Sequence, residues 1–320
     1  MFSAALALTG AFVYGAADFF GGLAAKRLRS IVVTAVAAAS GLVILGVALP
    51  FIGGEWTAVD MAWGALSGVT GVVAIALLYA CLAIGPMSIL SPLTAVVCAI
   101  APMLWGLFVN GETLSPAGYT GLGVAVVAVV LVGFIPGEKT VRPSMRGLLM
   151  AVGSGLAIGA FLIIIDQTSD ESGLVPLVMN RATNTVITLV IVGILVVRAT
   201  TAGRTAASVL AVSGAQIGAT PTGHADLEHA IAGTATPHVA GSRVRAWWLA
   251  ITCGVVDAAA NMLLLLALRT GDLSIVSALT ALYPAGTILL AAIVLHERVA
   301  GVQWIGLALA LAAGGMLAVA

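Results

Sequence analysis

The residues best suited to chemistry are ionisable side chains that lie inside long apolar runs. Asp18 lies in VYGAADFFGG, Arg181 in LVMNRATNTV and Asp257 in GVVDAAANML. A charged group inside an apolar segment is costly, so such residues are candidates for function by default. Asp18 could bind a cation or take up a proton. It could equally be an interfacial acid that pairs with Lys26 or bonds to a neighbouring helix.

Arg181 could provide a fixed positive charge for a carboxylate or phosphate, because its guanidinium fork suits bidentate pairing. The structural alternative is that it reaches the interface or pairs with Asp166 or Asp257. Asn180 and Asn184 flank it four residues apart, and residues at that spacing share a helix face. The stretch therefore predicts a polar stripe along one helix.

Asp257 and Asn261 show the same four-residue spacing near the middle of another apolar run. Asp257 is the deepest acid in the sequence. A desolvated carboxylate favours its protonated form, which suits proton uptake. A structural pair with Arg181 is the alternative.

Four aromatic residues complete the set of candidate binding residues. Such rings can hold apolar or cationic parts of a ligand, although each alone could also serve only packing. They are Tyr14, Tyr79, Trp105 and Tyr283.

The composition identifies the kind of protein that must position these residues. Of 320 residues, 61% are hydrophobic and only 8% are charged, against about 25% charged in a soluble domain. The chain is therefore expected to be a polytopic membrane protein. Its apolar runs are uniform over about twenty residues, as in membrane helices, and do not alternate as barrel strands do. The net charge of zero gives no electrostatic case for nucleic-acid binding.

Ten helical spans are predicted, joined mostly by short connections. Their approximate ranges are 3–24, 31–52, 61–83, 87–109, 115–135, 145–166, 174–197, 247–268, 272–294 and 300–319. Pro92, Pro102 and Pro284 are expected to kink or open the fourth and ninth spans, because proline removes a helix hydrogen bond.

An internal repeat organises these spans. Residues 77–121 resemble residues 263–306, and seven of the eleven positions 85–95 are identical to 271–281. Tyr14-Gly15 similarly matches Ile158-Gly159. The repeat unit is then five helices, 1–138 and 139–320. Because five is odd, the second copy is inverted, a layout found in many secondary transporters. The long Gly-, Ala-, Thr- and Ser-rich segment 199–246 is predicted to be a disordered insertion in the second unit.

Basic residues predict the orientation. All thirteen Lys and Arg residues except Arg181 and Arg269 fall in loops that follow an odd-numbered span. The positive-inside rule places those loops in the cytoplasm and both termini outside.

We find none of the sequence motifs HExxH, GxSxG or a P-loop, and no spacing of metal ligands. The sequence therefore predicts no enzyme, no cofactor and no metal site. The oligomeric state stays open, with a homodimer as one alternative.

The repeat also carries a family resemblance. YACLAIGPMSILSPLTA with NGETLSPAGYTG, and LLALRTGDLSIVSALTALYP with LHERVAGVQWIG, resemble the EamA-type carriers of the drug/metabolite transporter superfamily. The resemblance implies ten helices in two inverted repeats, a central cavity and alternating access. It also implies both termini in the cytoplasm, against the charge count.

The resulting expectation is a secondary active transporter in the cell membrane. Its substrate would be a small metabolite such as an amino acid, or a drug-like compound, exported or exchanged, with proton coupling as one alternative. Two other classes stay open: an integral-membrane enzyme on lipid-linked substrates, and a passive channel.

Overall fold

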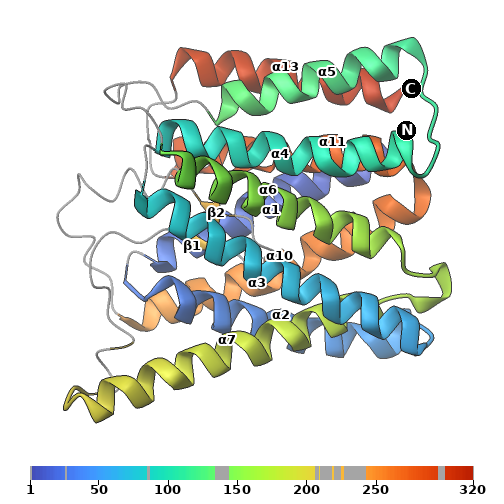
Figure 1. The fold of residues 1–320 in the computed structure, drawn as a ribbon. Helices are drawn as coiled ribbons and strands as arrows, with labels where there is room; N and C mark the ends of the chain where they lie inside the picture. Colours follow the sequence, from blue (N-terminus) through green and yellow to red (C-terminus); the bar gives the residue numbers. More distant parts are fainter. Residues whose placement is uncertain are drawn as a thin grey trace.

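The ten predicted spans form one helical bundle (Figure 1). The structure, a computed structural model, describes residues 2–25, 27–84, 87–133, 144–205, 209, 218–219, 225–226, 243–294 and 300–319. Side chains are described for these residues except 78–84, 87–89, 91–92, 218–219, 225–226 and 243. The helices are α1 (Phe2–Ala25), α2 (Ser30–Ile52), α3 (Ala58–Ile84), α4 (Met87–Phe108), α5 (Pro116–Val132), α6 (Met145–Asp166), α7 (Val175–Thr201), α10 (Arg243–Thr270), α11 (Leu273–Thr280), α12 (Tyr283–Val294) and α13 (Gly301–Ala318), with a short 3-10 helix η1 (Asp170–Ser172) before α7.

These helices are long and apolar enough to cross a membrane. Within the described residues, eight segments meet both conditions, one of them Leu273–Val294, which α11 and α12 form together. α4 and α5 add shorter apolar helices, Leu93–Phe108 and Pro116–Val132. Because lipid provides no hydrogen-bond partner for the backbone, helices satisfy these groups internally. The prediction of an all-helical polytopic membrane protein is confirmed.

The helix contacts follow the repeat. α1 packs against α10 and α12, and the equivalent helix α6 packs against α3 and α4. Likewise α2 packs on α10, and α7 on α3. Two spatial groups result: α3, α4, α6 and α7 form group A, and α1, α2, α10 and α11–α12 form group B. Each group mixes helices from both halves of the sequence. They meet where α2 contacts α7 and α4 contacts α11, while α5 pairs with α13.

Glycines allow the close crossings, and repeat-equivalent glycines lie at equivalent crossings. A Cβ on Gly68 of α3 would lie 2.6 Å from the Asn180 carbonyl oxygen of α7, and its counterpart Gly254 of α10 abuts Ala37 of α2 in the same way. A Cβ on Gly15 of α1 would lie 2.5 Å from the backbone of α12. The internal repeat is thus visible in packing as well as in sequence.

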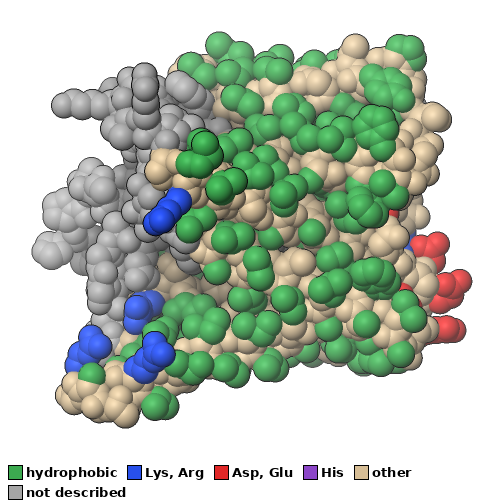
Figure 2. All heavy atoms as spheres, viewed as in Figure 1, with side chains coloured by type: hydrophobic (Ala, Val, Ile, Leu, Met, Phe, Trp, Pro, Cys, Tyr) green, Lys and Arg blue, Asp and Glu red, His purple; other side chains and the backbone are tan. Residues whose placement is uncertain are grey.

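The two ends of the bundle differ in charge. The N- and C-termini lie at the same end, which we call the terminus end (Figure 1). In Figure 2, the visible Asp and Glu side chains gather at the terminus end, and most visible Lys and Arg side chains gather at the opposite end.

Proline acts differently in the two predicted places. The ninth span is divided into α11 and α12, with a turn at 281–282 just before Pro284, as expected. α4 is a single helix through Pro92 and Pro102, so the fourth span is not opened there.

The segment 199–246 lies mostly outside the described residues. α7 extends to Thr201 and α10 begins at Arg243, so both helices enter it. Two short strands, β1 (Gly218–Ala219) and β2 (Ala225–Asp226), pair antiparallel within it.

Candidate functional site

A stripe of polar side chains runs down the buried face of α7, as the sequence predicts. α7 begins with proline in its first turn, where the missing N–H costs nothing. The stripe lies within the next turns, and each of its members is at most 8% exposed. Its members are Asn180, Arg181, Asn184, Thr185 and Thr188.

Arg181 forms a buried ion pair with Asp257 of α10. Both side chains are almost fully enclosed, at 1% and 0% exposed. The sequence left open whether Arg181 reaches the interface, pairs with Asp166 or pairs with Asp257, and the structure shows the last of these. Asp166 instead accepts a hydrogen bond of 3.1 Å from Asn110. A buried pair is weak evidence for stability, because desolvation offsets much of the attraction. Its presence in a membrane span therefore favours function.

Asn261 extends the pair towards α1. Its Nδ2 donates to the Asp257 carbonyl oxygen at 2.7 Å and to the Asp257 Oδ2 at 3.3 Å. The Tyr14 hydroxyl of α1 donates to Asn261 Oδ1 at 2.8 Å. Asp18 lies one turn after Tyr14 on α1 and is 1% exposed. α1, α10 and α7 thus contribute to one connected polar cluster.

Asn180 extends the polar region in the other direction. Its Nδ2 donates to the Ser67 hydroxyl of α3 at 2.8 Å, and that hydroxyl donates to the Gly64 carbonyl at 2.7 Å. Ser67 is fully buried and was not among the predicted site residues. A serine among glycines of an apolar span was the available signal, but only the α3–α7 crossing shows that it meets Asn180.

Some enclosed polar atoms of α7 have no hydrogen-bond partner among the described residues. They include Arg181 Nη1, Asn180 Oδ1 and Thr185 Oγ1. A buried polar atom without a partner is costly. The Arg181 Nη1 can donate a hydrogen bond, and the other two oxygens can accept one, so each retains unused hydrogen-bonding capacity.

The predicted aromatic residues are only partly brought together. Tyr14 belongs to the cluster, and Tyr283 is buried at the start of α12, where its backbone crosses Gly15. Trp105 is 38% exposed on α4 and belongs to the outer surface. The side chain of Tyr79 lies outside the described residues.

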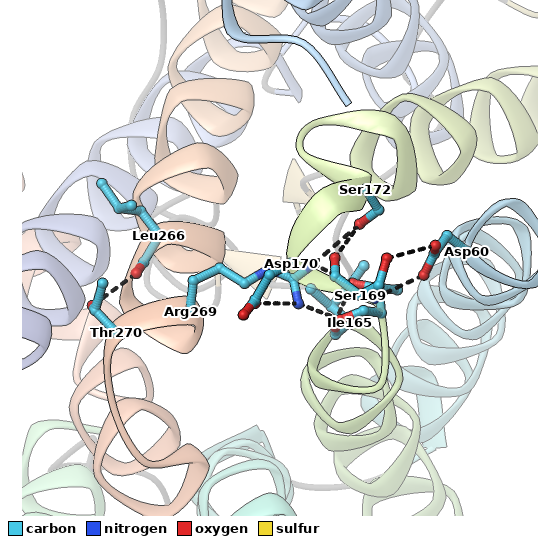
Figure 3. A network of polar contacts seen from close by, with 9 residues as sticks. Asp60, Ile165, Ser169, Asp170, Ser172, Leu266, Arg269 and Thr270 are labelled. Atoms are coloured by element: carbon cyan, nitrogen blue, oxygen red, sulfur yellow. Dashed lines mark hydrogen bonds and ion pairs between the residues drawn. The ribbon is translucent and has the colours of Figure 1, made fainter. Parts of the chain in front are cut away.

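A second polar network lies at the terminus end (Figure 3). Asp60 of α3 accepts hydrogen bonds from the backbone N–H of Ser169 and from the Ser169 hydroxyl, both at 2.8 Å. The Thr57 hydroxyl donates to the same carboxylate at 2.6 Å. The connection between α6 and α7 is thereby fixed to α3.

Arg269, at the end of α10, contacts the same connection (Figure 3). Its guanidinium donates to the Thr168 carbonyl, to the Thr168 hydroxyl at 2.6 Å and to the Ser172 hydroxyl at 3.2 Å. It also lies 3.4 Å from the Asp170 carboxylate, which is 79% exposed.

Glu112, which follows α4, makes a further contact at this end. Its carboxylate accepts hydrogen bonds from the backbone N–H groups of Leu273 at 2.8 Å and Ser274 at 2.9 Å. It therefore caps the N-terminus of α11, where a negative charge also complements the helix dipole. Partial desolvation, together with the negative charge of Glu112, raises the pKa of the neighbouring Asp272.

Among the residues that the structure describes, no three His, Cys, Asp or Glu side chains form a group that could hold a metal ion. The central cluster offers a cationic fork, a carboxylate, amides and hydroxyls in one enclosed place.

Comparison with known proteins gives a family match and a shared fold. Residues 231–318 match the EamA-like transporter family, which belongs to the drug/metabolite transporter superfamily, and this confirms the resemblance noted in the sequence. The chain is similar over 99% of its length to 98% of a solved chain described only as "Crystal structure of protein", with 14% identity and a TM-score of 0.67. That likeness shows a shared fold. No curated protein matches the chain. The family match suggests a membrane transporter and not an enzyme.

Proposed function

With the EamA-like match of residues 231–318 as the premise, we propose that this chain is a secondary active transporter of a small polar metabolite. Its substrate class would be amino acids or similar compounds, including drug-like ones, which it exports or exchanges by alternating access. The observation that carries the proposal is the buried Arg181–Asp257 pair.

The pair lies where a carrier needs its binding site. Arg181 belongs to group A and Asp257 to group B, so the pair spans the two sets of helices that would move against each other. Asp257 is also near the middle of α10. Inverted-repeat transporters place substrate sites near the bilayer midplane at the interface of moving parts.

The side chains around the pair have distinct proposed roles. Arg181 holds the anionic group of the substrate with its enclosed Nη1, while Asp257 or Asp18 takes up the proton if transport is coupled. Asn180, held by Ser67, and Asn184 orient polar groups of the substrate. Tyr14 positions Asn261 through its hydroxyl. These roles rest on burial and on the hydrogen bonds described above.

The test is transport by the purified full chain in liposomes. Vesicles are loaded with unlabelled amino acids and mixed with labelled ones outside, with and without a proton gradient. A carrier gives saturable counterflow, whereas a channel gives none. Further candidate substrates come from an untargeted comparison of the metabolites exported by a deletion strain and by its parent. The proposal would be contradicted if neither amino acids nor any of these metabolites gave counterflow.

The coupling role is tested separately with Asp257→Asn. We expect this variant to keep some exchange and lose its response to the proton gradient. If its pH-driven flux equals that of the unaltered chain, Asp257 is not the coupling residue, and Asp18→Asn becomes the next variant to measure.

A further inference from the structure

The network around Arg269 joins the two helical groups at one end of the bundle. Arg269 lies in the last turn of α10, which belongs to group B. Its hydrogen-bond acceptors, Thr168 and Ser172, lie on the connection between α6 and α7 of group A. The arginine side chain is only 16% exposed. In Figure 3 it reaches from α10 across to that connection. Arg269 therefore forms hydrogen bonds that connect group B to group A.

The segment that Arg269 contacts is itself firmly held. Asp60 binds Ser169 through two hydrogen bonds. The backbone N–H of Leu174 donates to the Gly53 carbonyl at 3.3 Å, and that of Glu55 donates to the Glu171 carbonyl at 2.8 Å. Gly53 and Glu55 follow α2 of group B, so these two backbone bonds also join the groups. A separation of the two helical groups at this end must break the side-chain bonds of Arg269 together with these two backbone bonds.

Glu112 provides a second side-chain bridge at the same end, between the segment after α4 and the start of α11. The two side-chain bridges differ in whether the other half of the repeat has a counterpart residue. Glu112 has a sequence counterpart, Glu297, in the second half, although Glu297 lies outside the described residues. The alignment that pairs Gly85 with Gly271 places Ala83 opposite Arg269.

The acceptor side shows the same asymmetry. The match of Tyr14-Gly15 with Ile158-Gly159 places Ala24 opposite Thr168. An Ala–Ala pair can form no side-chain hydrogen bond. The repeat-equivalent residues at the opposite end therefore lack the groups that make the Arg269 bridge.

We propose that Arg269 is a latch that holds the pathway closed at the terminus end and thereby biases the resting protein towards this state. The inference rests on the proposed function, because only a carrier that alternates has two such states. In an inverted repeat the two states arise when the halves exchange conformations. Interactions repeated in both halves would stabilise both states about equally. An interaction present in one half stabilises only one, and Arg269 provides such an interaction.

The test measures opening without any substrate. A cysteine replaces Leu265, which is 5% exposed and lies one turn before Arg269 on α10, in a full chain whose Cys81, Cys98 and Cys253 are alanine. The rate at which a polar maleimide labels this cysteine in detergent reports opening at the terminus end. Arg269→Gln removes hydrogen bonds made by a charged donor and should raise the labelling rate about tenfold.

Matched variants separate the latch from other effects. Asp170→Asn removes only the exposed partner and should change the rate less than about twofold. Thr168→Val keeps the shape of the acceptor side chain and removes its hydroxyl, so it should raise the labelling rate by an intermediate amount. This variant provides the test if Arg269→Gln does not purify as a folded protein. A second probe, Leu317→Cys, lies buried in α13 and should label slowly in every variant.

Equal labelling of Leu265→Cys with and without the Arg269 and Thr168 substitutions would overturn the latch. A parallel rise at Leu317→Cys would also overturn it, because it would indicate general loosening. Neither result depends on transport. Failure of the latch is thus distinguishable from failure of the proposed function, which would appear as absent counterflow in liposomes.

Discussion

Arg181 of α7 and Asp257 of α10 form a buried ion pair that connects the two helical groups. The two residues are far apart in the chain, and each is surrounded by apolar sequence. Their meeting places one positive and one negative charge in an enclosed site with amide and hydroxyl neighbours.

Removal of one partner of the pair should destabilise the protein. In Arg181→Met, the Asp257 carboxylate stays buried without its guanidinium, and breaking a buried pair in this way costs about 3–5 kcal/mol. The double variant Arg181→Met with Asp257→Leu should recover most of that stability, because no charge is then left uncompensated, and yet have no transport. Thermal unfolding in detergent and liposome counterflow measure the two effects. A double variant that is no more stable than the single one would show that the pair is not the source of the loss.

The Tyr14 hydroxyl should contribute through Asn261. Tyr14→Phe keeps the ring and leaves Asn261 Oδ1 without its 2.8 Å donor, at a cost of about 1 kcal/mol. We expect a small fall in melting temperature and a larger fall in substrate affinity, since Asn261 then loses its fixed orientation beside Asp257. Counterflow at several substrate concentrations separates affinity from maximal rate. An unchanged affinity would remove Tyr14 from the site.

Glycine at the crossing of α3 and α7 should be essential for packing. Gly68→Ala places a methyl group 2.6 Å from the Asn180 carbonyl oxygen, and such overpacking costs about 1–3 kcal/mol. Gly123 of α5 is the matched control, because nothing lies within 4 Å of a Cβ added there. Gly123→Ala should be neutral or slightly stabilising. Comparable melting temperatures for the two variants would contradict the close crossing.

The pH dependence of stability should change in Asp272→Asn. Because the pKa of Asp272 is raised above its ordinary value of 3.8, the folded protein binds this proton more tightly than the unfolded chain does. The contribution to stability is present at low pH and is lost as the pH rises from about 3.8 through the raised pKa. The variant should therefore match the unaltered chain at the acid end and melt at a higher temperature above this window. Melting curves across that pH range check the sign, and a variant less stable at neutral pH would contradict it.

Orientation is a further prediction. The gathering of Lys and Arg at the end opposite to the termini favours termini on the outside, whereas the family resemblance favours the cytoplasm. A reporter that is active only outside the cytoplasm, fused after Ala320, should therefore be active. Activity of a cytoplasmic reporter at the same position would reverse the assignment.

The amino-acid sequence alone is enough to predict the class of fold. Lipid offers no hydrogen-bond partners to the backbone N–H and C=O groups, so long uniform apolar runs are expected to form helices. The ten predicted spans agree with the observed helices to within a few residues. The repeat at 77–121 and 263–306 likewise indicated two related halves. Asp18, Arg181 and Asp257 stood out because an ionisable group in an apolar span is rare.

Which of these residues contact one another becomes clear only in the folded structure. The sequence allows several possible partners for Arg181, because residue spacing along one helix does not show which side chain faces it from another helix. The arrangement of α7, α10 and α1 pairs Arg181 with Asp257 and brings Tyr14 to Asn261. Trp105 of α4 lies on the outer surface. Ser67 and Arg269 gained a role only through contacts between helices distant in sequence. The physical reason is that burial and hydrogen bonding depend on which helix faces come together, and these are properties of the whole bundle.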